Sequence, residues 1–227
     1  MSKTLIIFDC DGVLVDSEFV SSRVFSEAVS EYGFTISTED CIKRFTGLCE
    51  KDCRQAIMEE SGIEIPNNYW SLLQPVLKKA YETELTALLH PVLEILDSLG
   101  ISRCVASNSS RNHVVECLEH TKQLKFFSDD TIFTSQQVPR AKPAPDLFLF
   151  AAEEMGFSPK DCIVIEDSST GANAAIAAGM KVLMYVGGSH AHFEWYRSKV
   201  SVHGKPIMSN CHELSNAIKQ AIEAKVT

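Results

Sequence analysis

The sequence has no long apolar run, and none of its hydrophobic segments approaches the roughly 18 residues of a membrane-spanning helix. Its amino terminus also lacks the charged region, apolar core and cleavage site of a signal peptide, so we expect a cytoplasmic protein. The net charge is -9, and there is no basic stripe that could neutralise nucleic-acid phosphates. We therefore expect neither a membrane nor a nucleic acid as partner, and we expect a monomer.

Cysteines in a zinc-binding arrangement are missing too, although the chain contains eight cysteines. Cys49 and Cys53 are four residues apart, but no second pair and no histidine follow them at zinc-ligand spacing. Cys104 and Cys162 lie in apolar segments, where a reduced thiol packs as a small hydrophobic side chain. Because we expect no export signal, we expect all eight thiols to be reduced.

Short apolar segments are present, and from residue 90 onward they alternate with helical patterns. The expected strands cover residues 5–8, 101–106, 131–134, 162–165 and 181–186. This alternation predicts an α/β fold with a parallel sheet covered by helices on both faces. Residues 17–85 contain helical patterns only, and they greatly exceed the single helix that a connection between parallel strands needs. The sequence therefore predicts an inserted all-helical domain.

Polar residues collect where the predicted strands end. They are Asp9 and Asp11 after the first strand, Ser107 and Asn108 after the second, Glu166 and Asp167 after the fourth, and Lys142 before the helix at 145. Because the carboxyl ends of parallel strands meet at one edge of the sheet, we expect these groups to converge. Two like charges about 4 Å apart repel by roughly 4 kcal/mol at an effective dielectric constant near 20, so four carboxylates together require a cation. Oxygen ligands alone favour Mg²⁺, and Lys142 and Ser107 suit a phosphate.

Taken in order, the four polar segments resemble the motifs of haloacid dehalogenase-like hydrolases that carry a helical cap. They read Asp9-Cys-Asp11-Gly-Val-Leu-Val-Asp16, Ala106-Ser107-Asn108-Ser109, Lys142-Pro-Ala-Pro-Asp146 and Glu166-Asp167-Ser168-Ser-Thr-Gly171. The resemblance covers almost the whole chain. It implies a Rossmann-like core domain formed by residues 1–16 and 86–227, with residues 17–85 as a mobile cap domain.

The resemblance also implies a role for each motif residue. Asp9 would be the nucleophile that forms an aspartyl phosphate, and Asp11 would be the general acid and then the general base. Ser107 and Lys142 would complete the catalytic set. The implied phosphate- and substrate-binding residues are Ser107, Asn108, Lys142 and, in the cap, Gly47. The implied Mg²⁺ ligands are Asp9, Asp11 through its backbone carbonyl, Asp167, and Glu166 either directly or from close by.

Several activities occur among proteins with these motifs. Asp11 favours phosphoryl transfer, because the dehalogenases lack the second aspartate, and we find no clear counterpart of the cap lysine of phosphonatases. A sugar-phosphate mutase resembling β-phosphoglucomutase is the main alternative. Those mutases carry a histidine where this chain has Ser21 and an arginine where it has Glu50, although Lys51 is adjacent. Both departures favour hydrolysis.

The segment Asp9–Arg23 and the residues leading to Gly47 are more similar to bacterial phosphatases that act on sugar phosphates, including 6-phosphogluconate. We therefore expect a small phosphorylated metabolite as the substrate. A catalytically inactive binding protein is a further alternative, which the presence of every catalytic carboxylate disfavours.

Two features outside the motifs have no assigned role. His190 and His192 follow Gly187-Gly188 and could bind a metal, but a rim loop that shapes the pocket is the interpretation we favour. The aromatic residues Phe193, Trp195 and Tyr196 come next, and we expect them to pack this loop onto the core.

Overall fold

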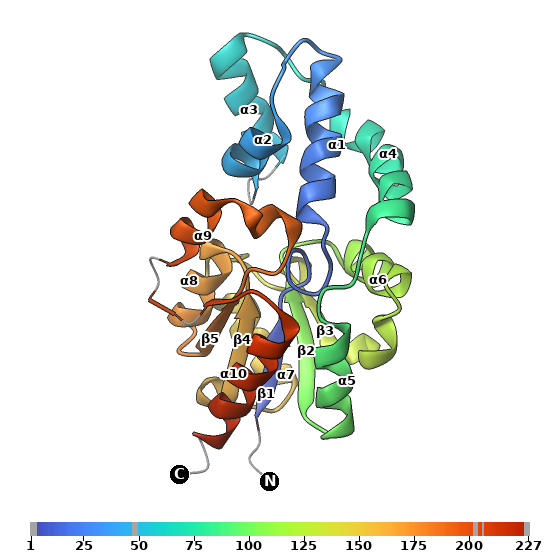
Figure 1. Cartoon of the computed structure of the whole chain (residues 1–227). Helices are drawn as coiled ribbons and strands as arrows, with labels where there is room; N and C mark the ends of the chain where they lie inside the picture. The colour runs from blue at the N-terminus through green and yellow to red at the C-terminus, as the bar shows by residue number, and fades with distance from the viewer. Residues whose placement is uncertain (1–3, 47–49, 202–203, 206, 225–227) are drawn as a thin grey trace. The chain divides into compact units, whose positions relative to one another are not determined.

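The computed structural model describes residues 4–46, 50–201, 204–205 and 207–224. The chain forms two compact units (Figure 1). The first consists of Met1–Val15 with Thr86–Thr227, and the second is Asp16–Leu85. Among the described residues, no helix is long and apolar enough to cross a membrane.

The first unit is built on a parallel sheet, whose six strands in the described part of the chain have the order β3-β2-β1-β4-β5-β6. The strands are β1 Leu5–Phe8, β2 Ser102–Ser107, β3 Ile132–Thr134, β4 Cys162–Glu166, β5 Lys181–Tyr185 and β6 Ile207–Met208. All four side chains of β1 are fully buried, as the centre of a sheet covered on both faces requires. The expected parallel α/β fold is confirmed.

Helices cover both faces of this sheet. They are α5 His90–Ser98, α6 Arg111–His120, α7 Asp146–Glu154, α8 Ser169–Ala177 and α10 Cys211–Glu223. Helix α9, Glu194–Ser201, packs instead against the 3₁₀ turn η5, Ser189–His192. Helices α5 and α10 contact each other on one face, whereas α7 and α8 contact each other on the opposite face (Figure 1). Small residues of α8, namely Gly171, Ala172, Ala174 and Ala175, are buried against the sheet.

The register of the central strands brings the polar segments to the same level. Phe8 of β1 is paired with Val105 of β2 and with Ile165 of β4. The next residues along these two strands, Asp9 after β1 and Glu166 at the end of β4, therefore lie side by side at the carboxyl edge of the sheet.

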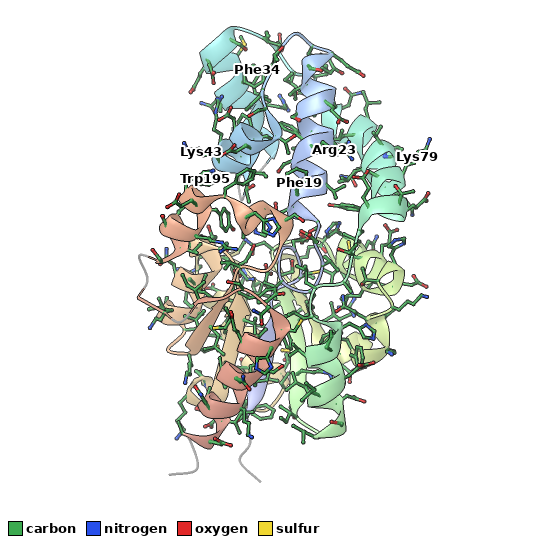
Figure 2. All side chains as sticks on the ribbon, viewed as in Figure 1. Phe19, Arg23, Phe34, Lys43, Lys79 and Trp195 are labelled. Atoms are coloured by element: carbon green, nitrogen blue, oxygen red, sulfur yellow. The ribbon has the colours of Figure 1, made fainter. Side chains whose placement is uncertain are left out.

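The second unit is helical throughout its described residues. Its helices are α1 Glu18–Ser30, α2 Thr38–Phe45, α3 Glu50–Ser61 and α4 Tyr69–Glu84. Phe25 is at the centre of its core, with ring centroids 5.6 Å from Phe45 and 6.0 Å from Tyr69. Figure 2 shows Arg23 between α1 and α4, where its guanidinium is 2.6 Å from the carboxylate of Glu84.

One strand and one α-helix of the first unit were not predicted. Strand β6 has only two residues, too few for a recognisable apolar pattern. Helix α9 contains Trp195 and Tyr196, which the sequence analysis wrongly assigned to a loop. Tyr196 is buried and Phe193 stacks on Trp195, so the aromatic residues do pack this segment.

Candidate active site

The loop after β1 carries Asp9 and Asp11 at the carboxyl edge of the sheet. The backbone N–H of Asp9 still donates to the carbonyl of Ile165, at 3.0 Å, and the chain then turns sharply. Gly12 has a φ of +77°, which favours glycine, and a Cβ at this position would lie 2.2 Å from Oδ2 of Asp167. Gly12 therefore allows the turn to pack directly against the loop after β4.

Lys142 connects two of the candidate carboxylates. Its Nζ donates to Oδ1 of Asp9 and to Oε1 of Glu166, each at 2.8 Å, and its side chain is only 3 % exposed. Burial alone would lower the pKa of Lys142, but the negative charges of Asp9 and Glu166 raise it above its usual value. The ammonium group therefore stays charged and compensates one carboxylate.

Asn108 fixes the backbone that carries this lysine. Its Nδ2 donates to the carbonyl of Lys142 at 3.1 Å, and its Oδ1 accepts from the Lys142 N–H at 3.0 Å. We expected Asn108 to bind phosphate. In the structure, its side-chain amide holds the backbone of Lys142 in place.

Glu166 is hydrogen-bonded through both of its oxygens. Besides the bond from Lys142 to Oε1, Oε2 accepts from the N–H groups of Asp167 and Ser168 and from the hydroxyl of Ser168, at 2.9 to 3.1 Å. A Cβ on Gly171 would lie 1.7 Å from Oε1 of Glu166, so only glycine leaves room for the carboxylate. The fourth motif is thus built around Glu166.

Three carboxylates form a group that could hold a metal ion. Asp9, Glu166 and Asp167 offer oxygens that all lie within 4.8 Å of one another. Burial raises the pKa of Asp9 well above its usual value despite the charge of Lys142, and burial together with Glu166 does the same for Asp167.

Lys142 balances only one of these three charges. When all three carboxylates are ionised, the group still carries two uncompensated negative charges, which a divalent cation would neutralise. Because all the donors are oxygens in a buried group, the residues present fit Mg²⁺.

The carboxylate of Asp11 has different neighbours. Oδ1 is 2.9 Å from Nε2 of His113, and Oδ2 accepts from the hydroxyl of Ser109 at 2.7 Å. The charge of Asp11 raises the pKa of His113 to about 11, although burial opposes the shift. The Asp11 carboxylate is not among the three that form the metal-binding group in the described part of the chain.

Both contacts of Asp11 were missed by the sequence analysis. Ser109 is in the second motif but had no assigned role, and His113 is in the first turn of α6, where an approach to the carboxyl edge of the sheet could have been expected. Ser107 is 2 % exposed, and its Oγ accepts from the N–H of Ser109 at 3.0 Å.

His190 was assigned to a rim loop, and this interpretation was wrong. The structure places it fully buried in the 3₁₀ turn η5, Ser189–His192, with Nε2 2.7 Å from Oδ2 of Asp167. His192, in the same turn, is exposed. Gly47, which was assigned to substrate binding, and Cys49 lie outside the described residues.

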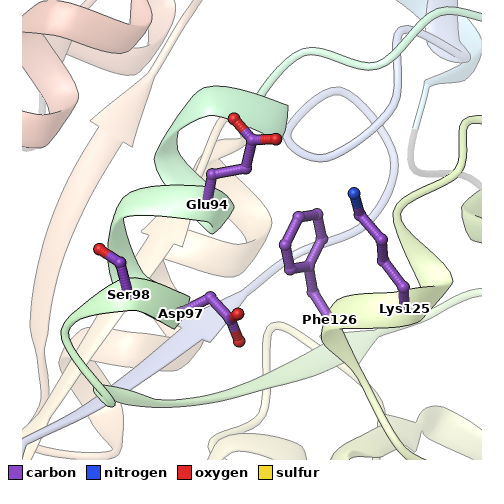
Figure 3. A pocket seen from close by; sticks show the side chains of 5 residues that line it. All are labelled: Glu94, Asp97, Ser98, Lys125 and Phe126. Atoms are coloured by element: carbon purple, nitrogen blue, oxygen red, sulfur yellow. The ribbon is translucent and has the colours of Figure 1, made fainter.

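A surface pocket of about 380 Å³ lies elsewhere in the first unit. Its lining, shown in Figure 3, consists of Glu94, Asp97 and Ser98 from α5 and of Lys125 and Phe126 from the 3₁₀ turn η1, Leu124–Phe126. Arg103 pairs with Asp97 at 2.5 Å and lies 5.7 Å from the Phe126 ring centroid. None of the lining residues belongs to the four motifs.

The parallel sheet, the helical insertion after its first strand and the acidic groups at its carboxyl edge define a class of hydrolases. The family model for haloacid dehalogenase-like hydrolases matches residues 6–185, and the chain belongs to this family.

Three relatives illustrate the range of similarity. The 6-phosphogluconate phosphatase of Escherichia coli strain K12 is 30 % identical over 192 residues, covering 82 % of this chain and 83 % of the relative. A haloacid dehalogenase-like protein of unknown function from Agrobacterium tumefaciens has a crystal structure with a TM-score of 0.83 and 32 % identity, covering 95 % of this chain and 97 % of the other. A family hydrolase from Deinococcus radiodurans, solved with bound phosphate and sodium, has a TM-score of 0.80 and 27 % identity, covering 97 % of each chain.

Proposed function

We propose that this protein is a Mg²⁺-dependent phosphatase that hydrolyses a small phosphate monoester, a sugar phosphate, through an aspartyl phosphate. The observation that carries the proposal is the group of Asp9, Glu166 and Asp167, together with the buried ammonium of Lys142 that contacts the first two. A charged lysine beside a carboxylate suits a reaction in which that carboxylate attacks a phosphoryl group, because the ammonium can hold the phosphoryl oxygens. The phosphatase relative supports the same activity.

In the first step, an oxygen of Asp9 attacks phosphorus, a bond from Asp9 to phosphorus forms, and the bond from phosphorus to the ester oxygen breaks. Asp11 delivers a proton to the leaving oxygen. The pair of Asp11 and His113 can supply it, because the raised pKa of His113 keeps one proton on the pair at neutral pH. Lys142 and Ser107 hold the phosphoryl oxygens during the transfer.

In the second step, Asp11 takes a proton from water, the water oxygen attacks phosphorus, and the bond to Asp9 breaks. Inorganic phosphate is released. The proton taken from water replaces the one that the Asp11–His113 pair gave up in the first step. Such a general acid and base typically contributes about 10²–10⁴ in rate.

We propose Asp9, Asp167 and the backbone carbonyl of Asp11 as the direct ligands of the ion. Glu166 acts from close by, since four donors already engage its carboxylate. A bound Mg²⁺ would neutralise charge on the phosphoryl oxygens and on Asp9.

The helical unit Asp16–Leu85 is proposed to act as the cap that selects the substrate, with Gly47 as one of its substrate-binding residues. The mutase alternative requires a histidine at position 21. Ser21 occupies it, and its hydroxyl donates to the carbonyl of Glu18 within α1 at 3.1 Å.

The test is hydrolysis of p-nitrophenyl phosphate by the full chain, with Mg²⁺ and with excess chelator. We expect turnover that requires Mg²⁺, and absence of turnover on a broad panel of phosphate esters with metal present would refute the proposal. In that panel, 6-phosphogluconate is the first sugar phosphate to try. Release of inorganic phosphate from glucose 1-phosphate, without isomerisation, would separate a phosphatase from a mutase.

A further inference from the structure

His190 makes a contact that the reaction steps above do not use. Its side chain is fully buried, and Nε2 is 2.7 Å from Oδ2 of Asp167, which is itself only 3 % exposed. The histidine lies outside the four motifs, in the turn between β5 and α9. A buried imidazole directly against a candidate metal ligand calls for a chemical reason.

The imidazole ring fits closely among its neighbours. A Cβ at Gly12 would lie 2.8 Å from Cε1 of His190, and a Cβ at Gly188 would lie equally close to Cε1 and Nδ1. Tyr196 meets the ring edge-on, with centroids 4.8 Å apart and an interplanar angle of 89°. Two glycines and one aromatic ring thus pack closely around the imidazole.

Nε2 of His190 lies within donor–acceptor distance of Asp167, 2.7 Å from Oδ2. Because an ionised carboxylate can only accept hydrogen bonds, Nε2–H is the group that could donate to it. The hydroxyl of Tyr196 is 3.4 Å from the same oxygen. Both groups face Oδ2, which leaves the other oxygen of the carboxylate available to a cation.

We propose that His190 is a positioning residue that orients the Asp167 carboxylate for the divalent cation. The inference rests on the proposed Mg²⁺-dependent phosphatase function and adds to it a residue outside the motifs. Groups that hydrogen-bond metal ligands typically change metal affinity by 10–100-fold when they are removed. His190 acts through Asp167, since its Nε2 faces that carboxylate.

The test measures binding of Mn²⁺, as a spectroscopic substitute for Mg²⁺, by the electron paramagnetic resonance signal of the free ion. His190→Phe keeps a flat ring but removes the donor, and His190→Gln keeps a donor near the position of Nε2. We expect His190→Phe to raise the Kd for Mn²⁺ at least tenfold and His190→Gln to recover most of the affinity. His192→Phe is the matched control, because His192 lies exposed in the same turn, and its Kd should equal that of the wild type.

Asp167→Asn identifies the site that is being measured. If this variant loses Mn²⁺ binding while His190→Phe keeps the wild-type Kd, the inference about His190 is wrong and the proposed function stands. If the wild type and Asp167→Asn bind Mn²⁺ equally and no ester is hydrolysed, the proposed function fails and the inference fails with it.

A purely structural role for His190 predicts a different pattern. The melting temperature of His190→Phe would fall, but the Kd of the folded protein for Mn²⁺ would not change, and this result also overturns the inference. Should His190→Phe not fold, as judged by circular dichroism, His190→Asn gives the same comparison, because the shorter amide cannot reach Asp167.

Discussion

Asp9 and Asp11 are two residues apart on one loop, yet their surroundings differ in kind. Asp9 lies beside two further carboxylates, both buried, and the ammonium of Lys142. Asp11 faces a hydroxyl and an imidazole, although the side chains of Asp9 and Asp11 are exposed to a similar degree, 14 % and 16 %. Asp9 is surrounded by several charged groups, whereas Asp11 contacts one imidazole that can gain or lose a proton.

The difference suggests how two chemically identical groups divide one reaction. A nucleophile must keep its charge while a phosphoryl group approaches, and Lys142 with a divalent cation would stabilise that charge. A general acid must exchange a proton, and the contact with His113 gives Asp11 a nearby partner for it. The environments of the two aspartates, more than the aspartates themselves, would therefore assign their roles.

The largest effect is expected from Asp9→Asn. Because the amide cannot form the acyl phosphate, kcat for p-nitrophenyl phosphate should fall at least about 10⁴-fold, and no phosphate adduct should form on the enzyme. Steady-state kinetics and mass spectrometry of acid-quenched enzyme measure both. Asp130→Asn, at an exposed position, is the control for the loss of one negative charge. Near-normal turnover by Asp9→Asn would mean that Asp9 is not the nucleophile, and the proposed division of roles between the two aspartates would fail.

A smaller and more specific loss is expected from Asp11→Asn, with kcat reduced about 10²–10⁴-fold. p-Nitrophenolate leaves without needing a proton, so transfer to Asp9 should continue while activation of water fails. Stopped-flow absorbance should then show a burst of p-nitrophenolate, and the phosphorylated enzyme should accumulate. A uniformly slow reaction without burst or adduct would mean that Asp11 does not act in the second step.

Many of the residues around Asp9 could be predicted from the sequence. Asp9 and Glu166 directly follow or end apolar strands, and parallel strands in register bring such ends together. Lys142 follows no strand, and only the order of the motifs connected it to the other two. Asn108 shows the limit of this reasoning, because a motif position does not reveal whether its amide binds a ligand or a neighbouring backbone.

The residues that contact Asp11 were harder to predict, for a physical reason. His113 reaches Asp11 from the first turn of a helix, and the path of the loop between β2 and α6 decides that approach. The contact of His190 with Asp167 likewise depends on an irregular turn. Gly187-Gly188 was a usable signal, since adjacent glycines often mark a close approach of the backbone to another group.

The smallest effect is on stability and concerns His113→Gln, compared with the wild type in chelator. The folded pKa of His113 is raised to about 11, above the unfolded value of about 6.5, so the ion pair with Asp11 stabilises the native state. This contribution is fully present near pH 6, below the unfolded pKa, and is lost as pH rises toward 11. Near pH 6, we expect the free energy of unfolding of the wild type to exceed that of His113→Gln by about 2 kcal/mol.

Urea unfolding of both proteins between pH 6 and pH 10.5 measures this difference. His120→Gln, at the exposed end of the same helix, is the matched control. Its difference from the wild type in free energy of unfolding should not shrink comparably as pH rises. A gap between wild type and His113→Gln that stayed constant across the range would mean that the imidazole packs against Asp11 without carrying the proton. The proposed difference between Asp9, which keeps its charge, and Asp11, which exchanges a proton, would then depend on Asp11 without help from His113.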